Sequence, residues 1–269
     1  MSSTDLFPHV IDTGGADAID VLCLHGLGGN AAYWDGAIES PAAPMPIRQV
    51  AWTMPGYGPS PALATTTIAT LADAALAVLD QAGIQQAVVV GHSMGGFIAQ
   101  QLAAAHPERV AGLVLVATTA VFGKPGSDFN ERFLKSRLAP IEQGLTPADF
   151  AAEVAAGLVG PQADPSLIEA AGASMAKISA AGYRNAVEAL VQFDGRALLP
   201  TLAMPVLAIA GSNDATASAG AMQHIVDLVP NGRLEVIANV GHLVNLEAPD
   251  EFRSLVTGFL TELTESTIA

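Results

Sequence analysis

The sequence predicts an α/β protein built on a doubly wound, mostly parallel sheet. Short runs of β-branched and other apolar residues alternate with alanine-rich stretches of helical spacing, as in chains of repeated β-α units. The 269 residues are 51% hydrophobic and 14% charged, a composition that suits a large core and excludes a disordered chain. A glycine-rich turn, residues 91–96, joins one apolar run to the next helical stretch.

The first half of the chain alternates regularly between strand and helix patterns. The expected strands are Ile19–Leu24, residues 47–53, residues 87–90 and the stretch from Val110 to Ala117; the expected helices are residues 67–82 and 97–105. In the first helix, Leu71, Ala75, Val78 and Leu79 recur at helical spacing, and Gly83 follows as a C-terminal stop. This alternation predicts parallel strands joined by helices that cover the sheet.

The pattern changes after the strand that ends at Ala117. From residue 118 to about 200 only helical patterns occur, separated by prolines such as Pro140, Pro147 and Pro165. Strands then resume at residues 205–210 and 234–237, with helices at residues 217–228 and after Pro249. We therefore expect an α/β core of residues 1–119 and 200–269, with a helical lid insert of residues 120–199.

The turn Gly91-His92-Ser93-Met94-Gly95-Gly96 has the pattern of a nucleophile elbow. It follows a predicted strand and precedes a predicted helix, which is the context that this motif needs. A sharp turn of this kind requires small residues two positions on either side of its centre, and Gly91 and Gly95 meet that requirement. Ser93 would stand above the sheet at a helix N-terminus, so we interpret it as a nucleophile.

A nucleophilic serine needs a base, and His242 is the candidate among six histidines. It lies in a loop between the last predicted strand and the final helix, where a doubly wound sheet would deliver a base. Asp214 directly follows the strand at residues 205–210 and would orient the imidazole. The order Ser93, Asp214, His242 is that of one known class of serine hydrolases.

An oxyanion formed at Ser93 needs two N–H donors. The backbone N–H of Met94 follows the nucleophile directly, and the turn that begins with His25 and Gly26 offers the N–H of Leu27. We interpret His25 and Gly26 as structural parts of that turn.

Together these motifs resemble the α/β-hydrolase superfamily over nearly the full chain. The matching segments are His25-Gly26, residues 55–60, residues 91–96, residues 211–214, Gly241-His242, residues 247–249 and Phe252. The resemblance implies an α/β-hydrolase fold, a Ser-His-Asp triad and a lid over the catalytic face. The chain departs from the family pattern at Thr53, where an aspartate is common, in a compressed N-terminal strand pair, and in lacking a proline within residues 215–220.

The reaction class is narrowed by two features of the resemblance. The nucleophile is a serine, whereas haloalkane dehalogenases and epoxide hydrolases use an aspartate. The segment at residues 242–247 is similar to that of 3-oxoadipate enol-lactonases, and Leu243 stands where carbon–carbon bond hydrolases often have tryptophan. We expect cleavage of a small ester or lactone; carbon–carbon bond hydrolysis of a diketone-type substrate and a non-catalytic ligand receptor are the alternatives.

The lid insert is expected to shape the substrate pocket. Its large apolar side chains are the candidates to line that pocket: Phe122, Phe133, Phe150, Tyr183 and Phe193 in the first place, with Phe129 and Met175. We expect two or three of these seven to do so. A basic residue of the insert could also hold a substrate carboxylate, although solvated faces explain the same basic residues.

Charge and composition exclude several other functions. Eleven basic residues against 26 acidic ones give a net charge of −15, which disfavours binding to nucleic acid or to an anionic membrane. The single cysteine, Cys23, excludes an intramolecular disulfide, and we expect no metal and no cofactor. The sequence shows no signal peptide or spanning segment, so a cytoplasmic location is expected. The sequence allows a homodimer but does not fix the oligomeric state.

Overall fold

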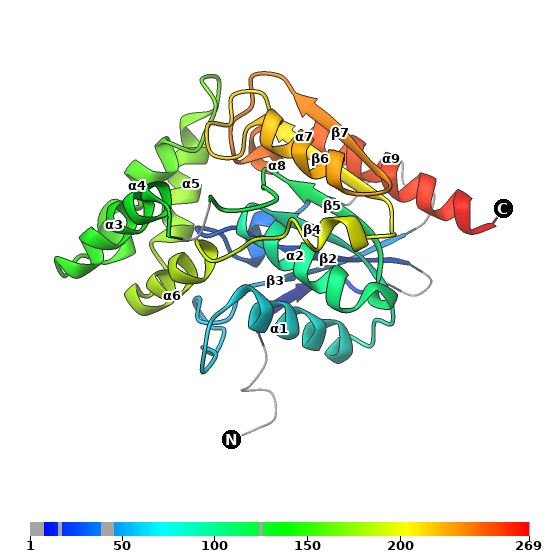
Figure 1. Cartoon of the computed structure of the whole chain (residues 1–269), viewed down its shortest axis with the longest axis horizontal. Coiled ribbons are helices and arrows are strands. Elements are labelled where there is room, and N and C mark those ends of the chain that lie inside the picture. The colour runs from blue at the N-terminus through cyan, green and yellow to red at the C-terminus, as the bar shows by residue number, and fades with distance from the viewer. Residues whose placement is uncertain (1–7, 16–17, 39–45, 124–125, 269) are drawn as a thin grey trace.

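The computed structural model describes residues 8–15, 18–38, 46–123 and 126–268. One seven-stranded sheet runs through the molecule in the order β1-β3-β2-β4-β5-β6-β7 (Figure 1). The strands are β1 (Val10–Asp12), β2 (Ile19–Leu24), β3 (Ile47–Trp52), β4 (Ala87–His92), β5 (Val110–Val116), β6 (Val206–Gly211) and β7 (Gly232–Ile237). The described pairs are parallel except for β1 with β3, which is antiparallel.

Helices cover both faces of the sheet because alternate strand residues point to opposite sides. On one face α1 (Ile68–Gln81), α2 (Met94–Ala105) and α7 (Ala219–Leu228) pack on Leu22, Leu24 and their neighbours. On the other face α9 (Pro249–Ile268) packs on Val21, Cys23 and the residues next to them in the sheet. The sheet is therefore doubly wound, which confirms the predicted fold class.

Four further helices lie between β5 and β6: α3 (Asp128–Glu142), α4 (Pro147–Ala156), α5 (Pro165–Met175) and α6 (Ala180–Leu190). Figure 1 shows them gathered at one end of the sheet. The two ends of this insert meet, since Phe122 N–H donates to the carbonyl of Phe193 at 3.1 Å and Gly195 N–H donates to that of Ala120 at 2.8 Å. An insert joined at its base in this way leaves the sheet uninterrupted.

One proline does not have the expected effect. Pro140 was predicted to separate helices, but it lies inside α3, which ends two residues later. A proline in the last turn removes one backbone hydrogen bond at a point where the helix is about to stop, so α3 accommodates it. Pro147 and Pro165 stand at the first positions of α4 and α5, where proline is favoured.

None of the helices in the described part of the chain combines the length with the apolar character that a membrane span requires.

Candidate active site

Ser93 occupies a strained turn between β4 and α2. Its backbone angles are φ 53° and ψ −118°, outside the ordinary regions for a residue with a side chain. A methyl group on Gly91 would lie 2.5 Å from the carbonyl oxygen of Gly95, and one on Gly95 would overlap the carbonyl of Leu24. Two glycines are thus needed for β4 and α2 to meet closely enough to project Ser93.

Asp214 and His242 form a buried hydrogen-bonded pair. His242 Nδ1 lies 2.7 Å from Asp214 Oδ2, while Asp214 Oδ1 accepts from the N–H groups of Thr216 at 2.7 Å and Ala217 at 2.9 Å. Burial acts to raise the pKa of Asp214, but the hydrogen bond and charge of His242 and the two N–H groups outweigh it, so the pKa lies below its usual value. An ionised Asp214 holds the proton on Nδ1 and leaves Nε2 of His242 as a base.

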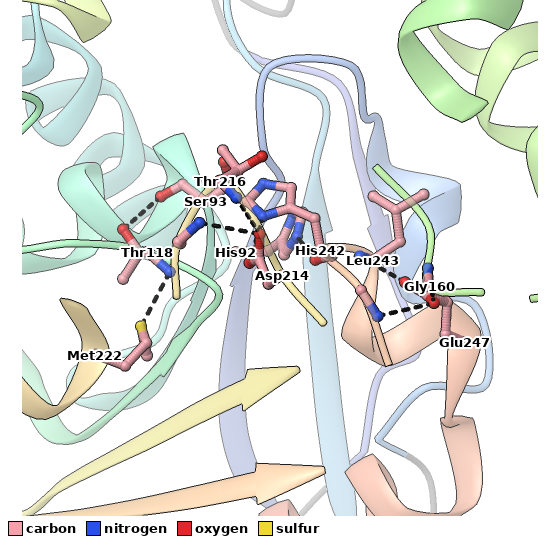
Figure 2. A network of polar contacts seen from close by, with 12 residues as sticks. His92, Ser93, Thr118, Gly160, Asp214, Thr216, Met222, His242, Leu243 and Glu247 are labelled. Atoms are coloured by element: carbon pink, nitrogen blue, oxygen red, sulfur yellow. Dashed lines mark hydrogen bonds and ion pairs between the residues drawn. The ribbon is translucent and has the colours of Figure 1, made fainter. Parts of the chain in front are cut away.

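Ser93 and His242 line the same cavity, and Figure 2 shows them beside His92 and Asp214. Among the described residues, no hydrogen bond joins Ser93 Oγ to His242. Contacts of this kind are often long without substrate and shorten in the bound complex. The arrangement can therefore supply a nucleophile, a base and a carboxylate that orients the base.

Hydrogen bonds to its carbonyl oxygen orient the peptide between Gly26 and Leu27. The carbonyl oxygen of Gly26 accepts from His25 Nδ1 at 2.7 Å and from Gly29 N–H at 3.1 Å. A planar trans peptide points its N–H opposite to its C=O. Leu27 lines the cavity with Ser93, which keeps the N–H of Leu27 a candidate donor there.

The peptide between Ser93 and Met94 is held in the same manner. The carbonyl oxygen of Ser93 accepts from Thr118 Oγ1 at 2.8 Å and from Gly96 N–H at 2.8 Å (Figure 2). Met94 is the first residue of α2, so its N–H has no acceptor in the preceding turn of the helix. Both donors predicted from the sequence thus belong to peptides whose carbonyls are hydrogen-bonded twice.

Two further histidines are buried and neutral. Burial lowers the pKa of His25 to about 4 and that of His92 to about 3. His25 Nε2 accepts from Met54 N–H at 2.9 Å, and His92 Nε2 lies 2.8 Å from the carbonyl oxygen of His242. His92 therefore supports the backbone of the loop that carries His242, a role that the sequence did not reveal. Within the described residues, no three His, Cys, Asp or Glu side chains are placed to hold a metal ion.

Glu247 ties the loop of His242 to the insert. Its Oε2 accepts from Gly160 N–H at 2.7 Å and Gly241 N–H at 3.0 Å, and its Oε1 accepts from Leu243 N–H at 3.0 Å (Figure 2). The N–H of His242 itself donates to the carbonyl of Leu158 at 2.7 Å. Sequence analysis noted Glu247 only as part of the resemblance. Its position five residues after His242 gave no sign of the contact with Gly160.

Apolar side chains dominate the lining of the cavity above Ser93, which measures about 90 Å³. Of the seven insert residues predicted as candidates, Phe122, Phe133 and Met175 line it. Phe150 and Tyr183 line an adjoining cavity of about 230 Å³ instead.

Phe193 and Phe129 lie outside both of these cavities. Phe193 is stacked on Phe97, with ring centroids 4.3 Å apart, and Phe129 is 52% exposed. Tyr33 and Arg137 also line the first cavity. Sequence reasoning did not identify Tyr33, and it considered Arg137 only as one of several basic residues of the insert that could hold a carboxylate. Neither belongs to a motif, so only the tertiary structure brings them there.

Comparison with known proteins identifies the family. A family model described as alpha/beta hydrolase fold matches residues 21–249. The 3-oxoadipate enol-lactonase 2 of Acinetobacter baylyi is 34% identical over 182 residues, which are 67% of this chain and 66% of that protein. A 2-hydroxy-6-oxononadienedioate/2-hydroxy-6-oxononatrienedioate hydrolase of a Pseudomonas species is 29% identical over 260 residues, 94% of this chain and 91% of that protein.

The fold is shared with solved structures. The enol-lactonase from Burkholderia xenovorans LB400 has a TM-score of 0.81 at 25% identity, over 94% of this chain and 96% of that one. The chain spans 63%, 66% and 48% of the length of three curated relatives that it matches.

Proposed function

Because the chain belongs to the α/β-hydrolase family, we propose that it is a serine hydrolase that cleaves a small ester or lactone through an acyl-enzyme on Ser93. The observation that carries the proposal is the pair of His242 and Asp214, 2.7 Å apart, in a cavity that Ser93 also lines. An imidazole held by a buried carboxylate next to a strained serine has the parts needed for general-base activation of that serine.

In the proposed first half-reaction, Ser93 Oγ attacks the carbonyl carbon of the substrate and its proton passes to His242 Nε2. The carbonyl oxygen becomes an oxyanion, which accepts hydrogen bonds from the N–H groups of Leu27 and Met94. The intermediate then collapses and expels the alcohol oxygen, which takes the proton from His242. The acyl group stays on Ser93, and a lactone ring is opened in this step.

In the second half-reaction, water replaces Ser93 as the attacking group. His242 Nε2 takes one proton of the water as the oxygen bonds to the acyl carbon, and a second oxyanion forms at the same two N–H groups. Its collapse breaks the bond to Ser93 Oγ, which recovers the proton from His242. The acid leaves, and no group of the protein is consumed.

Carbon–carbon bond hydrolysis is the second candidate, because the relative from the Pseudomonas species carries the name of a hydrolase of keto-dienedioate compounds. The same triad would serve, with a carbon rather than an alcohol oxygen as the leaving group. The local resemblance of residues 242–247 to enol-lactonases and the 34% identity with one of them favour ester or lactone cleavage.

Labelling of the nucleophile tests the proposal. The chain should react with a fluorophosphonate probe at Ser93, and Ser93→Ala should abolish both the labelling and the hydrolysis of a short ester. Product analysis on an ester, a lactone and a vinylogous diketone then distinguishes the two reactions. A protein that is neither labelled nor active on any of the three would contradict the proposed hydrolysis and favour the receptor alternative.

A further inference from the structure

Arg137 stands out among the charged side chains near the cavity. It belongs to α3 and lines both the cavity above Ser93 and the adjoining one. Among the described residues that line these two cavities, it is the one arginine or lysine, and no aspartate or glutamate lines the first. A positive charge therefore borders a mostly apolar space in a chain whose net charge is −15.

Arg137 has no partner for this charge within the described part of the chain. Its guanidinium lies over the ring of Phe133, with Cζ 5.3 Å from the ring centroid, and makes no hydrogen bond or ion pair with any described residue. Other arginines of the insert are paired: Arg196 with Asp194 at 2.6 Å, and Arg184 with Glu188 at 3.7 Å. Arg132 also forms no hydrogen bond or ion pair with a described residue, but it is exposed and lines neither cavity, whereas Arg137 lines both.

We propose that Arg137 binds a carboxylate of the substrate, so that the preferred substrates are esters or lactones that carry a second, ionised acid group. This inference rests on the proposed hydrolysis at Ser93. A guanidinium offers paired N–H donors that match a carboxylate, and Phe133 beneath it limits its orientations. The apolar lining strengthens the attraction, because low-polarity surroundings screen charge less than water does.

Glu153 also lines the adjoining cavity. Its side chain carries a carboxylate, the same group that we expect Arg137 to bind. It is exposed and forms no ion pair with Arg137. A carboxylate bound at Arg137 would be repelled by it, so Glu153 should weaken this preference rather than create it. Removing the charge of Glu153 should therefore raise the preference for charged esters, whereas removing that of Arg137 should lower it.

The test compares esters that differ only in a terminal carboxylate. Monomethyl adipate and methyl hexanoate place the charge in the acyl part; 4-acetoxybutanoate and butyl acetate place it in the alcohol part. We expect the parent protein to favour the charged ester in at least one pair. Arg137→Met should lower the ratio of kcat/KM between charged and uncharged esters by about 10- to 100-fold, the range of a charged hydrogen bond.

Three variants separate charge recognition from packing. Arg137→Lys should keep part of the preference, since it retains the charge. Glu153→Gln should increase the preference. Arg132→Met, which removes the same charge from an exposed position of α3, should leave the ratio unchanged.

Two results would overturn the inference: no preference for either charged ester in the parent protein, or an Arg137→Met ratio equal to that of the parent. If none of the four esters is hydrolysed in a Ser93-dependent manner, the proposed function itself fails. Hydrolysis of the uncharged esters alone would keep the proposed function and contradict only the role of Arg137.

Discussion

The hydroxyl of Thr118 donates a hydrogen bond of 2.8 Å to the carbonyl oxygen of Ser93, the residue that we propose as the nucleophile. This bond orients the peptide whose N–H belongs to Met94, one of the two proposed oxyanion donors. Thr118 lies just beyond β5, so the end of one strand positions a donor at the end of its neighbour β4. In the proposed mechanism, the preorganisation of the site therefore extends beyond the three residues of the proposed triad.

We expect Thr118→Val to lower kcat on a small ester by about tenfold with a smaller change in KM. Removing an oxyanion donor costs about 100-fold or more, and a misoriented donor should cost less. Steady-state kinetics provide the measurement. Thr261→Val is the matched control, because the Thr261 hydroxyl donates to the carbonyl of Thr257 and Thr261 does not line the cavity above Ser93. An equal loss in both variants would contradict a specific role for Thr118.

Asp214→Asn should lower kcat by about 10³- to 10⁴-fold, because an amide in place of the carboxylate favours the wrong tautomer of His242. Ser93→Ala and His242→Ala should each cost several orders of magnitude while the fold is kept. Since triad members act as a unit, the double variant of Ser93→Ala and Asp214→Asn should be no slower than Ser93→Ala alone. Additive losses in that double variant would argue against a shared mechanism.

The free energy of unfolding should decrease as the pH falls below about 6.5. His25 and His92 bind protons in the unfolded chain near that pH, whereas in the fold their pKa values are about 4 and about 3. Below that pH the unfolded chain holds more protons than the folded chain, so acid favours unfolding. For His25 the loss in the free energy of unfolding reaches about 3 kcal/mol when the pH approaches the pKa of His25 in the folded protein. Asp214, whose pKa is lowered, acts in the same direction.

Urea denaturation at about pH 7 and about pH 5 would measure this dependence. His92→Gln should make the stability less sensitive to pH. His224→Gln, which changes an exposed histidine, should leave the sensitivity as it is. A free energy of unfolding that does not change between the two pH values would show that the buried histidines accept protons without loss of stability.

Glu247→Gln should reduce both stability and turnover. The amide replaces one of the two carboxylate oxygens that accept from Gly160, Gly241 and Leu243, which leaves at least one buried N–H group without an acceptor. We expect a loss of about 1–3 kcal/mol in the free energy of unfolding. We also expect a drop in kcat at temperatures where circular dichroism shows the variant folded, because the loop of His242 is displaced.

Glu251→Gln serves as the control for Glu247, since it removes the same charge from an exposed position in the first turn of α9. Full turnover in folded Glu247→Gln would mean that the carboxylate supports the fold without positioning His242.

Phe133→Ala and Phe122→Ala should change the preference between a short and a bulky ester. Both side chains line the cavity above Ser93, so truncation should alter kcat/KM for the bulky ester by an amount on the order of 1–3 kcal/mol. Phe129→Ala is the matched control, because Phe129 contacts Phe122 but is 52% exposed and outside the cavity. If folded Phe122→Ala and Phe133→Ala both kept the parent's preference, these insert residues would not determine specificity.

The sequence alone predicted the order of the strands and helices and identified the residues of the proposed triad. Strand and helix periodicity is local, so each strand of the parallel sheet could be placed within a few residues. The elbow at Ser93 was equally accessible, because its glycines and its strand and helix neighbours are adjacent in the chain. Asp214 and His242 followed from the rule that such residues stand after the carboxyl ends of strands. The insert between β5 and β6 was recognised by its helical spacing.

The tertiary structure decided which side chains surround the site. Glu247 accepts from Gly160, 87 residues away, and His92 contacts the carbonyl of His242 across 150 residues. Of the predicted insert aromatics, only packing placed Phe133 at the cavity and Phe193 against Phe97. The sequence offered Arg137 only as one of several basic residues of the insert, and packing placed it at the cavity above Ser93. Periodicity reports which face of a helix is apolar, whereas the residues that this face meets depend on how separate segments pack.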